Sequence, residues 1–140
     1  MAGKILLEVV TPEHLLLSKQ VDEVIAPGVD GEFGVLPGHA PFLTSLKIGE
    51  LQYKMDNVWH YMSVLWGYAE VNQTKVTILA EVAEKAEDIN VERAAQKVAD
   101  AEQRLKTGGL PSDVKDAQIS LEKARLRQKL AERARSAARH

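Results

Sequence analysis

The 140-residue sequence contains no cysteine, which excludes a disulfide framework, a thiolate nucleophile and a cysteine-ligated zinc site. Its four histidines, His14, His39, His60 and His140, are scattered without the spacing of a metal-binding motif. Aromatic residues make up only 5% of the chain, and none is interleaved with the basic residues near the C-terminus, so nucleic-acid binding is not indicated. Without convergent polar groups, the chain is predicted not to be an enzyme by itself.

Long apolar runs are also missing. No stretch approaches the ~18 to 20 consecutive apolar residues of a membrane span. The first apolar run, Ile5–Val10, is too short for the hydrophobic region of a signal peptide, and no Arg- and Ser-rich transit segment accompanies it. We therefore expect a soluble protein that reaches a membrane only through a partner.

Charge is unevenly distributed, although the formal net charge is only −2. Residues 1–118 hold 18 acidic and 11 basic residues, whereas residues 119–140 hold seven basic and two acidic ones. This basic segment is either a solvated helix face or a docking surface for an acidic protein partner. Its basic residues are Lys123, Arg125, Arg127, Lys129, Arg133, Arg135 and Arg139.

Up to about residue 80 the sequence is typical of short strands separated by turns. β-branched, aromatic or alternating segments are bounded by pairs such as Pro27-Gly28, Asp30-Gly31 and Pro37-Gly38. Many short strands at close spacing predict an antiparallel sandwich or flattened barrel. The expected strands are 4–10, 21–26, 34–36, 50–55, 59–65, 68–72 and 75–79.

From about residue 82 the composition shifts to Ala, Glu, Lys, Arg and Gln, which favour helix. Asn90 is a suitable N-cap, and apolar residues spaced by 3, 4 and 7 predict a helix over about 91–106. Gly108 and Gly109 end it, and a second helix is expected over about 113–137. The Ala-rich seam predicts an antiparallel hairpin that is only weakly stabilised, because small side chains bury little area.

The chain as a whole is therefore predicted to be α+β. An N-terminal antiparallel β-sandwich or flattened barrel, residues 1–86, is followed by a C-terminal antiparallel α-helical hairpin, residues 87–140. The Gly-rich stretch 28–38 is not a Walker A loop, because no Gly-Lys-Ser/Thr ends it, and it also lacks the GxGxxG spacing. It is expected to form tight turns beside a short strand.

Three stretches resemble the epsilon subunit family of bacterial F-type ATP synthase. They are DGEFGVLPGHAPF at residues 30–42, VTP at 10–12, and ILA followed by AEKAEDI at 78–89. The similarity runs in order along essentially the whole chain, and the GVLPGHAP run is its most specific part. The change from the alternating pattern of strands to the 3.6-residue pattern of helices, after about residue 80, agrees with this resemblance.

The resemblance implies a non-catalytic rotor subunit of the central stalk in a proton- or sodium-translocating F-type ATP synthase. The sandwich would couple the c-subunit ring to the catalytic head through gamma, and the C-terminal helices would inhibit ATP hydrolysis. The partners would be gamma, the c ring, and the beta and alpha subunits. The protein would lie peripherally on the cytoplasmic face of the bacterial plasma (inner) membrane, as part of the complex.

The same resemblance suggests site residues but no catalytic or metal-ligating ones. The expected interface with gamma or the c ring consists of Gly31, Glu32, Phe33, His39, Ala40 and Pro41. The expected contact with the catalytic head consists of Lys123, Arg125, Arg127, Lys129, Arg133 and Arg135.

The family also offers a nucleotide site, whose motif is Ile or Leu, then Asp, two residues, Arg and Ala. Here the acid is replaced by Asn90, so the match is partial and puts regulation by ATP in doubt. No cofactor is required, and ATP would at most bind weakly as a regulator. The candidate ATP-binding residues are Glu84, Ile89, Asn90, Arg93, Ala94, Lys123 and Arg127.

Two other classes of protein stay open at this point. A free-standing adaptor or scaffold could use the hairpin as a permanent oligomerisation arm, and co-purification with alpha, beta and gamma subunits would exclude it. A small-molecule-binding enzyme of sandwich fold is disfavoured by the missing polar constellation, and turnover by the isolated protein would revive it.

Overall fold

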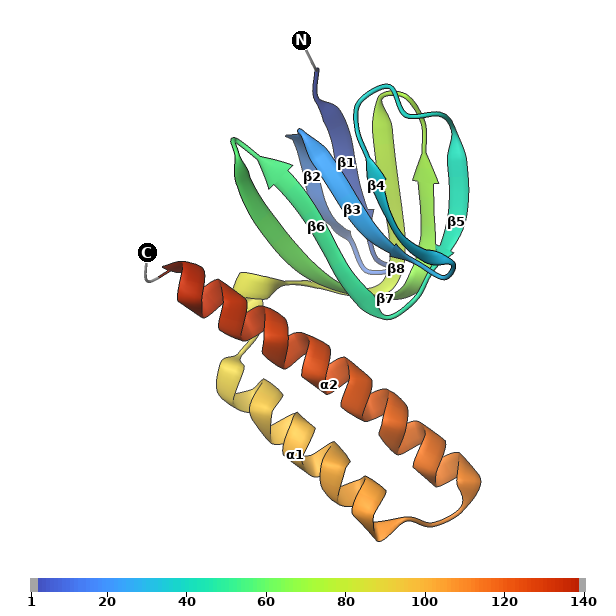
Figure 1. The fold of residues 1–140 in the computed structure, drawn as a ribbon, viewed down its shortest axis with the longest axis vertical. Coiled ribbons are helices and arrows are strands. Elements are labelled where there is room, and N and C mark those ends of the chain that lie inside the picture. The colour runs from blue at the N-terminus through green and yellow to red at the C-terminus, as the bar shows by residue number, and fades with distance from the viewer. Residues whose placement is uncertain (1–2, 139–140) are drawn as a thin grey trace. The chain divides into compact units, whose positions relative to one another are not determined.

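The computed structural model describes the backbone of residues 3–138 and the side chains of residues 3–136 (Figure 1). The chain divides into two compact units, Met1–Glu84 and Lys85–His140. The first unit is built from strands, and the second from a short 3-10 helix and two α-helices. The predicted α+β fold, a β-sandwich followed by two packed helices, is confirmed.

The strands of the first unit follow one another through short turns. They pair in the order β2-β1-β8-β7-β5-β3-β4, and β6 pairs with β3 and β7. Their bounds are β1 Ile5–Val10, β2 Leu15–Val21, β3 Glu23–Gly28, β4 Gly31–Val35, β5 Phe42–Leu46, β6 Gly49–Met55, β7 Val58–Val71 and β8 Lys75–Lys85.

The pairing is antiparallel in most of the sandwich but not throughout it. β1 and β8 are parallel, with Leu6 opposite Lys75 and Val10 opposite Leu79. A parallel pair needs a long connection, and here the rest of the sandwich provides it. The expectation of a purely antiparallel sheet is corrected at this one pair.

Two strands, β2 and β5, were not expected from the sequence. β2 places three leucines before three polar residues, and its register with β1 shifts between Val9 and Val10, so its alternation is broken. β5 has only one buried residue, Leu46, and its other side chains are exposed or half-buried, so it shows no alternation of buried and exposed residues. Such strands are fixed by their neighbours in the sheet and carry little periodic signal of their own.

β7 is one long strand where the sequence predicted two. Its first part, Val58–Val64, pairs with β6, and its last part, Gly67–Val71, pairs with β5. Trp66 has a φ of 48° and Gly67 a φ of 145° where the partner changes. A Cβ on Gly67 would lie 1.8 Å from the carbonyl oxygen of Leu79, so only glycine fits this bend.

The core of the sandwich follows the alternation of its strands. In β1, Ile5, Leu7 and Val9 are fully buried while the residues between them are partly exposed. Leu51, Met62 and Ile78 are also fully buried in the same cluster. One face of each strand therefore lines a continuous apolar interior, and the opposite face remains available for partners.

The second unit begins with a 3-10 helix, η1 (Ala86–Asp88), and α1 (Val91–Thr107). The Asn90 side chain accepts a hydrogen bond of 2.8 Å from the backbone N–H of Arg93, as an N-cap should. α1 ends at Gly108, whose N–H donates to the carbonyl of Arg104. This glycine has a φ of 74°, a conformation that favours glycine at a helix end.

α2 (Pro111–Ala138) begins two residues before the expected start. Proline suits the first helical position, and the Asp113 carboxylate accepts a hydrogen bond from the Leu110 N–H at 3.2 Å. The two α-helices run antiparallel (Figure 1) and pack through a seam of small side chains. The fully buried or nearly buried residues of that seam are Ala94, Ala101, Ala117, Leu121 and Ala124.

Candidate partner-binding surfaces

One outer face of the sandwich carries apolar side chains where polar ones are usual. Val10 in β1 lies opposite Leu15 of β2 on one side and opposite Leu79 of β8 on the other. Leu15 is 52% exposed and Leu79 is 44% exposed. Three neighbouring strands therefore present an apolar strip directed away from the core.

The strip continues onto β7 and β5. Tyr68 lines the same surface depression as Val10 and Leu79, and it is 56% exposed. Leu43, 69% exposed, lies opposite Glu70 and is the diagonal neighbour of Tyr68. We call these five residues, Leu15, Val10, Leu79, Tyr68 and Leu43, the apolar row.

Sequence reasoning missed all five members of the apolar row. The available signal was the presence of apolar residues on both faces of one strand, as in Val9-Val10 and Ile78-Leu79. A strand with one solvated face alternates apolar and polar residues, so adjacent apolar residues indicate a second covered face.

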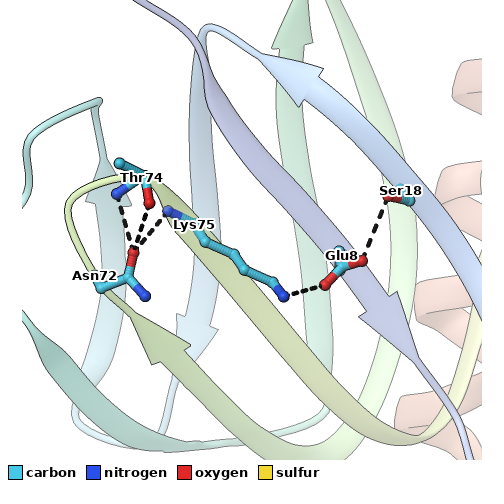
Figure 2. A network of polar contacts seen from close by, with 5 residues as sticks. All are labelled: Glu8, Ser18, Asn72, Thr74 and Lys75. Atoms are coloured by element: carbon cyan, nitrogen blue, oxygen red, sulfur yellow. Dashed lines mark hydrogen bonds and ion pairs between the residues drawn. The ribbon is translucent and has the colours of Figure 1, made fainter.

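Figure 2 shows a network of polar contacts in the same sheet. Its member Glu8 precedes Val10 by two residues in β1, so the two side chains lie on the same face. Lys75 pairs with the carboxylate of Glu8, which also accepts a hydrogen bond from the Ser18 hydroxyl. In the β7–β8 turn, the Asn72 side-chain oxygen accepts from the N–H groups of Thr74 and Lys75, at 3.0 Å and 2.9 Å. An apolar strip with a polar border is the usual anatomy of a protein interface.

The predicted interface residues Gly31, Glu32 and Phe33 lie at the β3–β4 hairpin. Gly31 and Glu32 are exposed, and Val29 at the turn is 51% exposed. Phe33 is half-buried and packs edge to face on Phe42 at 5.2 Å between ring centroids.

The other predicted segment, His39, Ala40 and Pro41, lies in the loop between β4 and β5. The His39 ring lies 6.4 Å from that of Phe42, and its Nδ1 is 2.6 Å from the Ala40 carbonyl oxygen. Ala40 and Pro41 are exposed. Since Phe33 and His39 both pack on Phe42, the structure brings the hairpin and the loop together.

The candidate ATP residues are spread along the second unit and the end of the first. Ile89 and Ala94 are buried, and the side-chain oxygen of Asn90 is engaged as the helix cap. Arg93 is exposed, whereas Lys123 and Arg127 of α2 are half-buried. Glu84 belongs to β8 in the first unit.

The register of α1 against α2 gives the distances between these residues along the hairpin axis. Ion pairs align Glu92 with Arg135 and Glu102 with Arg125, at 3.0 Å and 3.7 Å. At ~1.5 Å per residue, Arg127 lies about 10 Å and Lys123 about 16 Å along the hairpin axis from the level of Arg93. A ligand that touched all of them would have to be as extended as a nucleoside triphosphate.

The predicted head-contact residues all lie on α2. Arg125 and Arg135 are exposed and pair with acids of α1, while Lys129 is exposed and Lys123, Arg127 and Arg133 are half-buried. Arg139 lies outside the described residues. Within residues 3–136, no group of three or more histidine or acidic side chains could hold a metal ion.

Comparison with protein families matches both units. Residues 4–86 match the beta-sandwich domain of the ATP synthase delta/epsilon chain, and residues 87–132 match its long alpha-helix domain. The ATP synthase epsilon chain of Citrifermentans bemidjiense is 52% identical over 137 residues, covering 96% of this chain and 98% of that one. The epsilon chain of Nitratidesulfovibrio vulgaris is 51% identical over 124 residues, covering 89% and 92%.

A solved structure supports the fold. A chain in the mitochondrial ATP synthase of Euglena gracilis superposes with a TM-score of 0.78 at 22% identity, covering 100% of this chain and 84% of that one. The family matches span nearly the whole chain, and the bacterial relatives share about half of its residues. The chain therefore belongs to the delta/epsilon chain family of ATP synthase, as an accessory subunit without catalysis of its own.

Proposed function

We propose that this epsilon-type subunit works in the central stalk of an F-type ATP synthase, where its sandwich binds the gamma subunit through the apolar row. The observation that carries the proposal is that Leu15, Leu43, Tyr68 and Leu79 are 44% to 69% exposed along one sheet face. Contiguous exposed apolar surface of this kind marks a protein interface. Covering it contributes about 25 cal/mol per Å² of apolar area.

The β3–β4 tip and the loop that contains His39 are proposed as a joint contact with gamma and the c ring. Both segments pack on Phe42, at 5.2 Å from Phe33 and 6.4 Å from His39. A force applied to the tip would therefore be passed to the loop through packed rings. That linkage suits a subunit that transmits torque between two neighbours.

We propose that the subunit lies peripherally on the cytoplasmic face of the bacterial plasma membrane, held there by the complex. None of the helices in residues 3–138 has the length and apolar character of a membrane span. The relatives in Citrifermentans bemidjiense and Nitratidesulfovibrio vulgaris are bacterial.

The C-terminal helices are proposed to inhibit ATP hydrolysis by contacting acidic segments of the beta and alpha subunits. Arg125 and Arg135 pair with Glu102 and Glu92 through exposed side chains. Exposed pairs of this type stabilise a fold by only ~0.2 to 1 kcal/mol each. An acidic surface on the head can therefore compete for these arginines with little loss.

ATP is proposed to bind the hairpin weakly. Asn90 offers one neutral side-chain oxygen, which already accepts from the backbone N–H of Arg93, whereas a carboxylate would offer a second, charged oxygen to the Arg93 guanidinium. The hairpin register spreads the basic candidates along the helix axis, so ATP would reach all of them only in an extended conformation.

The proposed gamma contact is tested by measuring affinity for gamma and co-assembly with the alpha, beta and gamma subunits. Leu79→Ser removes one apolar side chain from the row and should weaken binding by roughly three- to tenfold, because Leu79 is 44% exposed and about half of the ~1.5 to 3 kcal/mol for burying a leucine remains to be gained. Val58→Ser is the matched control, because Val58 is 55% exposed but lies at the β6–β7 turn, outside the row. Equal affinities of the two variants would reject the proposal.

A further inference from the structure

A depression of about 310 Å³ interrupts the apolar row at its centre. Val10, Pro12, Gly67, Tyr68, Leu79 and Glu81 line it. All of them belong to the first unit, so the depression is a feature of the sandwich alone. Its volume is at the low end of the range for ligand sites, which corresponds to one or two large side chains.

The backbone at the depression is held in an unusual conformation. Trp66 has a φ of 48°, which bulky residues rarely adopt, and it directly precedes Gly67. Gly67 lets β7 approach β8 so closely that a Cβ there would lie 1.8 Å from the Leu79 carbonyl oxygen. Backbone strain concentrates at sites of function, and here it shapes the wall of the depression.

The rim of the depression carries an acidic group. Glu81 is exposed, and because it follows Leu79 by two residues in β8 it projects from the same face. It is the one carboxylate among the residues that line the depression in the described part of the chain. The remaining lining is mostly apolar, so the site combines an apolar floor with one negative charge at its edge.

We propose that this depression receives one bulky apolar side chain of the gamma subunit, and that a Lys or Arg beside that side chain pairs with Glu81. The inference rests on the proposed function and names the anchor of that interface. Leu15 and Leu43 extend the apolar surface to both sides of the depression. A small ligand in the depression would leave both exposed, whereas a protein segment with a central anchor covers the whole row.

The test is the affinity of the full chain for purified gamma, with folding of each variant checked by circular dichroism. Val10→Trp fills the depression and should weaken binding at least about tenfold, although it adds apolar area to the row. Val58→Trp is the matched control and should bind as the unaltered chain does, because Val58 lies outside the row.

Charge reversal provides an independent variant that does not alter the core. Glu81→Lys should weaken binding about tenfold at low salt and reduce its dependence on salt, because a rim pair is screened by ions. Asp116→Lys, an exposed acid on α2 with the same change in charge, is the control.

Each result separates this inference from the proposed function. If Val10→Trp binds unchanged or more tightly while Leu79→Ser binds weakly, the anchor is wrong and the apolar row stands. If Leu79→Ser also binds gamma normally, the anchor and the proposed contact through the apolar row are both wrong. If Val10→Trp does not fold, Glu81→Lys decides, and unchanged affinity overturns the proposal. An apolar compound that stays in the depression of the assembled complex, detected by native mass spectrometry, would also overturn it.

Discussion

The Arg135 Nη2 of α2 donates a hydrogen bond to Glu92 Oε1 of α1 at 3.0 Å, although 43 residues separate the two along the chain. Ten residues later in α1 and ten residues earlier in α2, Glu102 and Arg125 repeat the arrangement at 3.7 Å. The two pairs agree on one register of α1 against α2, since each joins residues at the same level of the antiparallel hairpin. The charged surface of the hairpin therefore favours the same alignment as the buried seam that contains Ala94 and Leu121.

Reversing one charge of the first pair should destabilise the hairpin slightly. Arg135→Glu places two acids together and should cost about 0.5 to 1 kcal/mol, because both side chains are exposed. Adding Glu92→Lys should recover most of the loss. A double-mutant cycle from denaturant unfolding measures the coupling. A coupling energy of zero would mean that the pair does not set the register.

Gly67→Ala should destabilise the sandwich by more than about 3 kcal/mol, since the added Cβ cannot be accommodated without moving β7 from β8. The control is Gly34→Ala, where the added Cβ would lie 4.0 Å from the Val24 carbonyl oxygen, an ordinary contact. Its cost should be less than about 1 kcal/mol, as for other strand positions. Similar midpoints in urea for the two variants would contradict the tight contact at Gly67.

Asn90→Asp should strengthen the weak binding of ATP by roughly three- to thirtyfold, because a carboxylate holds the Arg93 guanidinium by a charge-assisted hydrogen bond. The fold should be unaffected, since Asp caps a helix as well as Asn does. Asn90→Ala is the control and should lose about 1 kcal/mol of stability through the missing cap. Titration calorimetry with ATP decides it, and tight binding by the unaltered chain would contradict this account.

The pair formed by Lys4 and Asp22 should make stability depend on pH at both extremes. The hydrogen bond from the Lys4 ammonium lowers the pKa of Asp22 below its ordinary value of 3.8 and raises the pKa of Lys4 above 10.5. The contribution of Asp22 is present above pH 3.8 and is lost as the pH falls through its lowered pKa. The contribution of Lys4 is present below pH 10.5 and is lost as the pH rises through its raised pKa.

This dependence is measured by thermal unfolding of the unaltered chain and of Asp22→Asn. The unaltered chain should lose more stability on acidification below pH 3.8 than the variant does. Asp116→Asn, at an exposed position of α2, is the control and should follow the unaltered chain. Parallel curves for all three proteins would show that the pair has no role in acid stability.

Replacing Arg125, Arg127 and Arg133 with Glu should relieve inhibition of ATP hydrolysis in the reconstituted complex without preventing assembly. The Arg125 change also breaks the pair with Glu102. Easier opening of the hairpin would strengthen inhibition, so relief would have the sign expected for a lost head contact. The control changes the exposed Lys97, Lys106 and Lys115 to Glu, which alters the net charge equally. Equal hydrolysis rates in the two variants would show that the basic face is only solvated.

The helical part of the fold was the most predictable from sequence. Asn90 and Gly108 mark the ends of α1 by local chemistry, so the expected helix over 91–106 differs by one residue from Val91–Thr107. The start of α2 combines Pro111 at the first helical position with a hydrogen bond from the Leu110 N–H to the Asp113 carboxylate. A helix end is easier to predict when a single residue such as Asn90 or Gly108 marks it than when two residues must interact to form it.

The sandwich and its proposed binding surface were harder to predict. β2 and β5 are stabilised by strands distant in sequence, so their own alternation is weak. The apolar row depends on cross-strand register, since Val10, Leu15 and Leu79 become neighbours only when β1 pairs with both β2 and β8. No single stretch of sequence contains that juxtaposition.

The parallel pairing of β1 with β8 has a consequence for synthesis of the protein on the ribosome. The first strand of the chain cannot acquire its central partner until Lys75–Lys85 has been made. Pairings between residues so distant in sequence are slow to form, and their unpaired edges are exposed to aggregation meanwhile. The early hairpin of β1 and β2 therefore keeps one edge of β1 unpaired until β8 has been synthesised. Within each C-terminal helix the hydrogen bonds are local, so each helix can form on the microsecond timescale once it has emerged, without waiting for a distant strand.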